Sequence, residues 1–249
     1  MKKDIERKQG QTERYDQVGV AMTCRGFAEY ELMFGLDEAL LGRGPVLDVA
    51  AGASSFAAEA RSRGIDVVCA DPRYALTAGQ IAAEGAAEIE ASTEKLERLA
   101  HRFDWSYYGD IASHKAGRIR SLELFVRDYE RHAGRGRYTA DMLPRLSFAD
   151  HSFALVLCSH FLFLYREQFD DAFHRAALAE LLRVCRPGGE VRVYPLLSLG
   201  WEPYPQFPEL IAFVEGLGGA CSLEKSGLPF IPGSTDMLRI RKTGDATAE

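Results

Sequence analysis

The stretch from Val46 to Asp71 constrains the fold more than any other part of the sequence. An apolar run, Val46 to Val49, precedes a turn of small residues, Ala50 to Ser54. A segment of helical character follows, Phe56 to Arg63, and then a second apolar run that ends at Asp71. Short, continuous apolar runs are typical of buried parallel strands. The sequence therefore predicts a strand, a helix and a second strand in succession.

The turn between the first strand and the helix carries almost no side-chain bulk, so a ligand can approach its backbone. The following helix would present its N-terminal N–H groups to such a ligand. Asp71 lies 23 residues after Asp48, close to the spacing of about 20 residues at which an acid after the second strand reaches a ribose diol. The alternative is an ordinary crossover, in which the small residues only allow close packing.

Three segments resemble the class I S-adenosylmethionine-dependent methyltransferases, in particular a methyltransferase type 11-like domain. Asp48 to Ser54 resembles the glycine-rich turn of that family, with Ala50 and Ser54 where the family usually has glycine. Leu146 to Tyr165 is similar to its fourth-strand segment. Glu180 to Tyr194 is similar to its helix, Pro-Gly-Gly turn and fifth strand. The segments follow the family's order over about 150 residues.

The resemblance implies an α/β protein with the Rossmann-like class I methyltransferase fold: a central, mostly parallel, seven-stranded sheet with helices on both faces. We expect one domain over residues 1–249, with an N-terminal helical cap at 1–44. A helical insertion is expected after the second strand, at 75–137, because ordinary crossovers are much shorter. Within the cap, Tyr15 and Phe27 are expected in the core, and the alternative is a lid beside the cofactor.

Part of the expected insertion is basic and aromatic. Lys95 to Arg137 contains ten lysines and arginines against six aspartates and glutamates. Its middle holds Phe103, Trp105, Tyr107 and Tyr108. Such a segment is suited to recognising an anionic or aromatic substrate. The alternative is a solvated helical face with a few residues anchored in the core.

The resemblance also implies a site for S-adenosyl-L-methionine, which would leave as S-adenosyl-L-homocysteine. By this resemblance Asp48 and the backbone of the turn hold the methionyl part, and Asp71 accepts hydrogen bonds from the ribose hydroxyls. Asp141, Met142 and Leu143 are candidates for the adenine end, and Ser159 for the methionyl end. The residues implied to bind the cofactor are Asp48, Ala50, Ala51, Gly52, Ala53, Asp71, Pro72, Met142, Leu143, Cys158 and Ser159.

Methyl transfer from a sulfonium is an in-line displacement with a good leaving group, so we expect neither a covalent nucleophile nor a metal. The protein must place donor and acceptor collinearly and exclude water. A base is needed only if the acceptor must lose a proton that solvent cannot take. His160 is the candidate, because it follows a predicted strand at the edge where ligands bind. The alternative is a hydrogen-bonded structural histidine.

The sequence disfavours DNA as the acceptor. It contains no Asn/Asp-Pro-Pro-Tyr motif and no Pro-Cys pair, which DNA-modifying relatives use on an extruded base. A net charge of −6 also disfavours a general nucleic-acid surface. We therefore expect a small or medium-sized molecule as acceptor, with RNA or protein as alternatives. Two other functions stay open: a non-catalytic regulatory protein that binds the cofactor, and aminopropyl transfer from a decarboxylated cofactor.

Composition indicates the cellular compartment. The five cysteines are scattered and form no C-x-x-C motif, a pattern of free thiols in a reducing environment. The first 14 residues are charged and lack the apolar core of a signal peptide. The longest apolar run, Phe153 to Tyr165, is shorter than the ~20 residues that span a bilayer. We therefore expect a cytoplasmic protein without a membrane partner.

Overall fold

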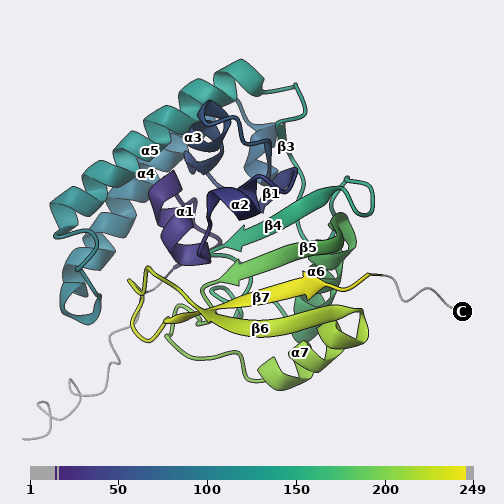
Figure 1. Cartoon of the computed structure of the whole chain (residues 1–249). Helices are drawn as coiled ribbons and strands as arrows, with labels where there is room; N and C mark the ends of the chain where they lie inside the picture. Colours follow the sequence, from purple (N-terminus) through teal and green to yellow (C-terminus); the bar gives the residue numbers. More distant parts are fainter. Residues whose placement is uncertain (1–14, 16, 245–249) are drawn as a thin grey trace, which may run out of the picture.

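The computed structural model describes residue 15 and residues 17–244, and it contains a seven-stranded sheet between helices (Figure 1). The order across the sheet is β3-β2-β1-β4-β5-β7-β6. Six strands run in the same direction, and β7 runs opposite to them, between β5 and β6. The expected Rossmann-like fold is confirmed. Residues 1–14 of the expected N-terminal cap lie outside the described range. The strands are β1 (Val46–Val49), β2 (Val67–Ala70), β3 (Tyr138–Thr139), β4 (Phe153–Ser159), β5 (Cys185–Tyr194), β6 (Gly219–Lys225) and β7 (Asp236–Lys242).

Helices cover both faces of the sheet (Figure 1). The first face carries α1 (Phe27–Phe34), α3 (Phe56–Ser62), α4 (Ala78–Arg98) and α5 (Ile111–His132), which share one apolar cluster. The short helix α2 (Glu38–Leu41) joins α1 to β1. The second face carries α6 (Asp171–Val184) and α7 (Phe207–Gly216), which share the other cluster. Since β1 and β4 are buried along their whole length, both faces of the central strands are covered.

Aromatic rings fix α1 against α3. The ring of Phe56 stacks on Tyr30 at a centroid distance of 4.3 Å and on Phe27 at 5.5 Å. Both α1 rings are buried, so Phe27 belongs to the core as the sequence indicated. Tyr15 has a different position, on the wall of a cavity. These contacts place the segment before α1 directly over the turn that follows β1.

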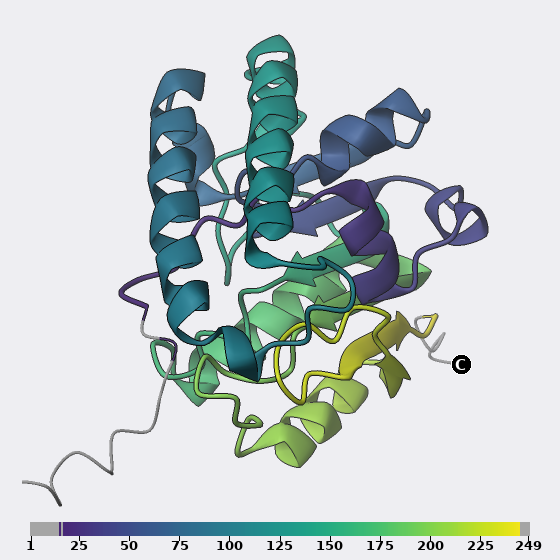
Figure 2. The same ribbon diagram turned by 90° about the vertical axis from the view of Figure 1, so that its left-hand side faces the viewer.

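The chain between β2 and β3 forms two long helices, preceded by η2 (Pro72–Ala75) and joined through η3 (Ala100–Arg102). The side chain of Thr77 caps α4, and that of Asp110 caps α5. Figure 2 shows the two helices side by side. Gly85 permits their close approach, because a Cβ there would lie 2.7 Å from a methyl carbon of Leu122.

One detail differs from the sequence-based expectation. Pro187-Gly188-Gly189 was expected to be a turn before the fifth strand, but it lies inside β5. The pairing of β4 with β5 shifts register between Phe153 and Leu155, and this irregularity accommodates the turn residues within the strand. The helix before this segment, α6, begins at Asp171, where the side chain of Asp170 accepts a hydrogen bond from the Phe173 amide.

Gly189→Ala is expected to lower the free energy of unfolding by about 1–3 kcal/mol. A Cβ at this position would lie 2.8 Å from the Ala154 carbonyl oxygen and 2.9 Å from that of Arg186. Neither backbone atom can move without disturbing the β4–β5 pairing. Urea denaturation measures the change. Gly79→Ala in the first turn of α4 is the control, since nothing lies within 4 Å of its Cβ; it should leave stability unchanged or higher. Equal effects of the two substitutions would contradict the steric argument.

Candidate cofactor site and adjoining cavity

The turn after β1 is bound to the end of β2. The amides of Ala50 and Ala51 donate hydrogen bonds to the Ala70 carbonyl oxygen, at 2.8 and 3.4 Å. Ala50 has φ +55° and Gly52 has φ +58°. A left-handed conformation costs an L-residue about 1–2 kcal/mol, so Ala50 is held in this shape by its surroundings. The backbone therefore keeps the form of a glycine-rich turn although alanine replaces one glycine.

Asp71 joins this turn to the turn after β2. One carboxylate oxygen accepts a hydrogen bond from the Gly52 amide at 3.0 Å, and the other accepts from the Arg73 amide at 2.9 Å. Burial raises the pKa of the carboxyl, and the two amide hydrogen bonds oppose this effect. Asp71 thus lies at the C-terminal end of β2, where the sequence placed it, with its oxygens already oriented by the backbone.

Asp48 lies within β1 and is 1% exposed. The hydroxyl of Tyr30 donates to one of its oxygens at 3.4 Å, whereas Oδ2 has no hydrogen-bond partner among the described residues. Burial raises the pKa of this carboxyl to about 8; the Tyr30 hydrogen bond lowers it and Asp71 raises it further. A buried acceptor without a partner is unfavourable, so Oδ2 is available to a polar group of a ligand.

The segment 20–25, here called the strap, crosses directly over the turn. The carbonyl oxygen of Thr23 accepts a hydrogen bond from the Ala53 amide at 2.9 Å. The same oxygen lies 2.8 Å from the position that a Cβ of Gly52 would take, and the Thr23 nitrogen lies 3.0 Å from it. Arg73 and Tyr165 bind the strap at Val20 and Ala21. The strap therefore packs directly against the turn at Gly52 and Ala53.

The other expected cofactor residues are distributed around this turn. Cys158 and Ser159 end β4 and are buried beside β1. Leu143 is buried in the cluster of the second face, but Met142 is 63% exposed. Pro72 begins η2 and is also exposed. None of these residues borders the cavity described next.

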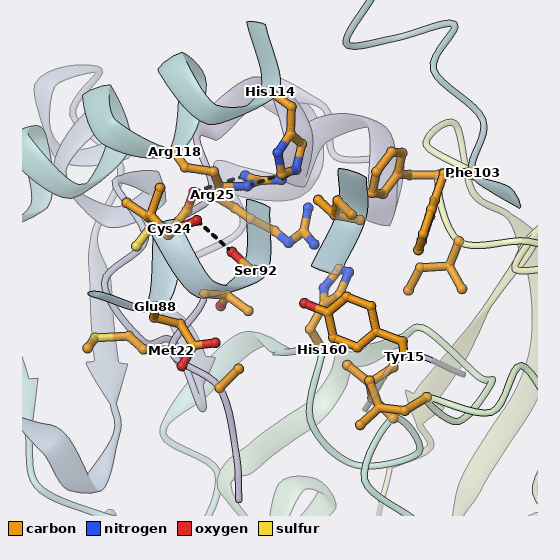
Figure 3. A pocket seen from close by; sticks show the side chains of 18 of the residues that line it. Tyr15, Met22, Cys24, Arg25, Glu88, Ser92, Phe103, His114, Arg118 and His160 are labelled. Carbon is orange, nitrogen blue, oxygen red and sulfur yellow. Dashed lines mark hydrogen bonds between the residues drawn. The ribbon is translucent and has the colours of Figure 1, made fainter. Parts of the chain in front are cut away.

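A cavity of about 120 Å³ lies at the C-terminal end of β4 (Figure 3). Of the site residues expected from the sequence, His160 alone borders it. The strap forms one wall, and Thr23 connects the cavity to the turn, since it borders the first and hydrogen-bonds to the second. The other walls come from Tyr15, α4, Phe103 after η3, the first part of α5, the β4–α6 segment, the segment 198–201 and the segment 230–231.

His160 has an unusual backbone conformation, with φ +51°. Its amide donates to the Tyr194 carbonyl oxygen at 2.7 Å, and its Nδ1 lies 3.0 Å from the Ser159 hydroxyl. Burial, followed by the charges of Arg25 and Arg118, holds the pKa of the imidazole well below its usual range. The ring is therefore neutral at pH 7 and is a weak base suited to hydrogen bonding.

The sequence did not identify a buried ionic cluster beside the cavity. The Glu29 carboxylate binds the Arg25 guanidinium at 3.1 Å and the Arg118 guanidinium at 2.8 Å. The hydroxyl of Tyr108 donates to Glu29 at 2.5 Å. Arg25 comes from the strap, Glu29 from α1, Tyr108 from the loop before α5 and Arg118 from α5, so about 80 residues separate the two halves of the cluster. The basic and aromatic character of Lys95 to Arg137 was the only sequence signal for this cluster.

The described part of the chain contains no group of histidine, cysteine or acidic side chains arranged to hold a metal. All five cysteines are free. Among the described helices, none is both long and apolar enough to cross a membrane.

Comparison with known sequences gives two matches. Residues 123–193 match the methyltransferase domain family. An uncharacterized protein of Methanocaldococcus jannaschii, MJ0045, is 31% identical over 219 residues, which are 88% of this chain and 94% of that protein.

Comparison with solved structures finds methyltransferases of low sequence identity. A TehB-like S-adenosylmethionine-dependent methyltransferase from Corynebacterium glutamicum is 15% identical, with 80% of each chain covered and a TM-score of 0.42. A 1,6-didemethyltoxoflavin-N1-methyltransferase from Burkholderia thailandensis, with 1,6-didemethyltoxoflavin and S-adenosylhomocysteine bound, is 17% identical. That comparison covers 82% of this chain and 74% of the other, with a TM-score of 0.46.

The strand order, the turn after β1 and the domain match define an α/β protein of the methyltransferase type. The chain belongs to the class I S-adenosylmethionine-dependent methyltransferases, in one family with MJ0045 of Methanocaldococcus jannaschii. The cofactor of this class is S-adenosylmethionine.

Proposed function

We propose that this protein is an enzyme that transfers a methyl group from S-adenosylmethionine to a small or medium-sized acceptor held in the cavity. The position of the cavity carries the proposal. It opens at the C-terminal end of β4, the edge of the sheet where ligands bind in such folds. Thr23 borders both this cavity and the turn after β1, so donor and acceptor would occupy neighbouring sites.

The residues around the turn fit the cofactor. Asp71 offers a carboxylate fixed by two backbone amides, and Asp48 offers an unpartnered oxygen. When bound, S-adenosylmethionine supplies a methyl group on a sulfonium with a good leaving group. The chain itself binds the donor and the acceptor, orients them and excludes water. The residues proposed to hold the cofactor are Asp48, Ala50, Ala51, Gly52, Ala53, Asp71, Pro72, Met142, Leu143, Cys158 and Ser159.

We further propose that His160 contacts the acceptor. It borders the cavity, and its neutral ring can accept a proton or a hydrogen bond from a hydroxyl or amine. Because burial makes this imidazole a weak base, it suits an acceptor whose proton becomes acidic only as the methyl group is transferred. Positioning of the acceptor is therefore its main role.

The small volume of the cavity, about 120 Å³, favours a small molecule over RNA or protein as acceptor, and the acidic net charge disfavours DNA. The free cysteines support a cytoplasmic location. One observation favours a second function, a regulatory protein that binds the cofactor without turnover. The strap covers Gly52, and Ala50 adopts a left-handed conformation that usually requires glycine. Both features narrow the space that the cofactor would need at the turn.

Asp71→Ala is expected to lower the affinity for S-adenosylmethionine and S-adenosylhomocysteine at least tenfold, because it removes the acceptor for the ribose hydroxyls. Isothermal titration calorimetry measures both ligands against the wild type, for which we expect micromolar binding. Asp66→Ala is the control. It removes an exposed acid at the opposite end of β2 and should leave affinity within twofold.

Circular dichroism confirms that each variant is folded before titration. Absence of cofactor binding to folded wild-type protein would overturn the proposed function. Tight binding without formation of S-adenosylhomocysteine across a broad set of acceptors would favour the regulatory alternative.

A further inference from the structure

The cavity has a positively charged end that the cofactor site does not explain. Arg25 and Arg118 share the single carboxylate of Glu29, and all three side chains are about nine-tenths buried. The neighbouring histidines add no charge at pH 7, since burial lowers the pKa of His114 to about 2 and also holds that of His160 low. The cluster therefore has one positive charge more than its own residues neutralise.

Two hydrogen-bond donors at this end lack a partner. Arg118 donates two N–H groups to Nε2 of His114, at 3.2 and 3.1 Å. Nε2 is therefore an acceptor, and the proton of this neutral ring is on Nδ1. Neither Nδ1 of His114 nor Nε of Arg25 has a hydrogen-bond partner within the described chain, although both atoms are buried. Both residues border the cavity, and Figure 3 shows the Arg25 side chain extending toward His160.

A buried, unpaired donor costs about 1–3 kcal/mol, and more when it is charged. An oxyanion in the cavity would satisfy both donors and neutralise the surplus charge. A carboxylate suits the planar guanidinium of Arg25 in particular.

The rest of the cavity is mainly apolar, with several aromatic rings and one acidic group. Phe103 stacks on Phe230 at a centroid distance of 4.9 Å, and Phe230 stacks on the ring of His114 at 5.4 Å. The cavity measures about 120 Å³. Glu88 also borders it, and Oε1 of this side chain is buried without a hydrogen-bond partner among the described residues.

We propose that the cavity binds a small aromatic carboxylic acid, with its carboxylate on Arg25 and His114 and a hydroxyl or amino group toward Glu88. This inference rests on the proposed function, because the acid would be the methyl acceptor. The carboxylate of the cofactor is the other source of the same chemistry. The acceptor is favoured because the residues of the turn, Ala50 to Ser54, do not border the cavity.

Calorimetry with 4-hydroxybenzoate, benzoate and the corresponding amides tests the proposal. We expect wild-type protein, with S-adenosylhomocysteine bound, to prefer each acid over its amide by at least tenfold. Arg25→Gln should remove this preference. Glu88→Gln should lower the affinity for 4-hydroxybenzoate at least threefold and leave the affinity for benzoate unchanged. Equal affinity for acids and amides in the wild type would overturn the proposal.

The variants have matched controls. Arg98→Gln removes an exposed arginine at the end of α4 that does not border the cavity, and it should change no affinity. If Arg25→Gln does not fold, His114→Phe replaces it, since phenylalanine keeps the stacking on Phe230 and removes the Nδ1 donor. It should reduce the preference for acids at least threefold. An unchanged preference in a folded variant would contradict the assignment.

A comparison of S-adenosylhomocysteine with 5′-methylthioadenosine, which lacks the amino-acid part, separates the two sources of the carboxylate. If Arg25 binds the acceptor, Arg25→Gln changes the affinity for both nucleosides by less than threefold. If Arg25→Gln lowers the affinity for S-adenosylhomocysteine but not for 5′-methylthioadenosine or the acids, Arg25 binds the cofactor and the proposal is wrong. Wild-type binding of S-adenosylhomocysteine without binding of acids would overturn this inference and leave the proposed function standing.

Discussion

Replacing Glu29 with glutamine is expected to lower the free energy of unfolding by about 3–5 kcal/mol, the usual result of removing one partner from a buried ionic group. The carboxylate is the common anion for Arg25 and Arg118, and it also accepts hydrogen bonds from the Gly26 amide and the Tyr108 hydroxyl. Glutamine retains one acceptor oxygen but no charge. Two buried guanidinium groups would then face each other without an anion.

The same carboxylate predicts how stability responds to acid. Burial raises the pKa of Glu29, but Arg118, Arg25 and the hydrogen bonds from Tyr108 and Gly26 outweigh it and lower the pKa to about 2. The unfolded value is near 4.5, so the stabilisation is complete above pH 4.5 and is lost as pH falls toward 2. The wild type should lose about 1.4 kcal/mol per pH unit in this window from this group.

Urea denaturation of both proteins at several pH values between 3 and 7 measures these effects. The stability difference between wild type and Glu29→Gln should shrink as the pH falls below 4.5. Glu31→Gln is the control, since it alters an exposed glutamate of the same helix whose nearest cation, Arg63, is 3.9 Å away. It should change stability by less than about 0.5 kcal/mol. A difference for Glu29→Gln that does not depend on pH would show that the charge is not what stabilises this cluster.

The strand, turn and helix from Val46 to Ser62 were predictable because each has a local cause. Continuous apolar runs indicate buried strands, and small residues indicate the turn. The position of Asp71 at the end of β2 follows from the length of the helix and the second turn. His160 was predictable for the same reason, since it directly follows the apolar run that forms β4.

The cavity was not predictable, because its walls depend on packing between distant segments. Arg118 donates a hydrogen bond to the Cys24 carbonyl oxygen, and 94 residues separate the two. The strap also has no helical or strand structure that a periodic pattern would reveal, although it covers the turn. The Pro-Gly-Gly segment shows a similar limit, because a local turn signal became a strand irregularity once β5 paired with β4.

Asp48 and Glu29 are both buried carboxyl groups, but their surroundings shift the two pKa values in opposite directions. Glu29 has two cations within 3.1 Å. Asp48 has only the Tyr30 hydroxyl at 3.4 Å, and the nearby carboxyl of Asp71 further disfavours its charge. Asp48 is therefore held in a place that favours its neutral form. Such a residue lowers stability at neutral and alkaline pH, which is consistent with a role in binding rather than in folding.

Asp48→Asn is therefore expected to stabilise the protein as pH rises. The folded pKa of about 8 lies above the unfolded value near 3.8, so wild-type stability from this group is complete below pH 4 and is lost progressively up to pH 8. Asparagine has the same shape and no charge. The gain should be near zero at pH 4 and, at about 1.4 kcal/mol per pH unit between the two pKa values, on the order of 6 kcal/mol at pH 9. Urea denaturation across this range measures it, with the exposed Asp66→Asn as control.

The same variant tests whether Asp48 has a binding function that explains why the chain keeps an acid that lowers its stability. If its unpartnered oxygen binds the amino group of the cofactor, Asp48→Asn should bind S-adenosylhomocysteine at least tenfold more weakly than wild type. The affinity for 5′-methylthioadenosine, which lacks that amino group, should be unchanged. A variant that is more stable and binds both nucleosides as the wild type does would refute the binding role. Greater stability with selective loss of S-adenosylhomocysteine would show that the buried acid is retained for the ligand, because the fold alone is better served by asparagine.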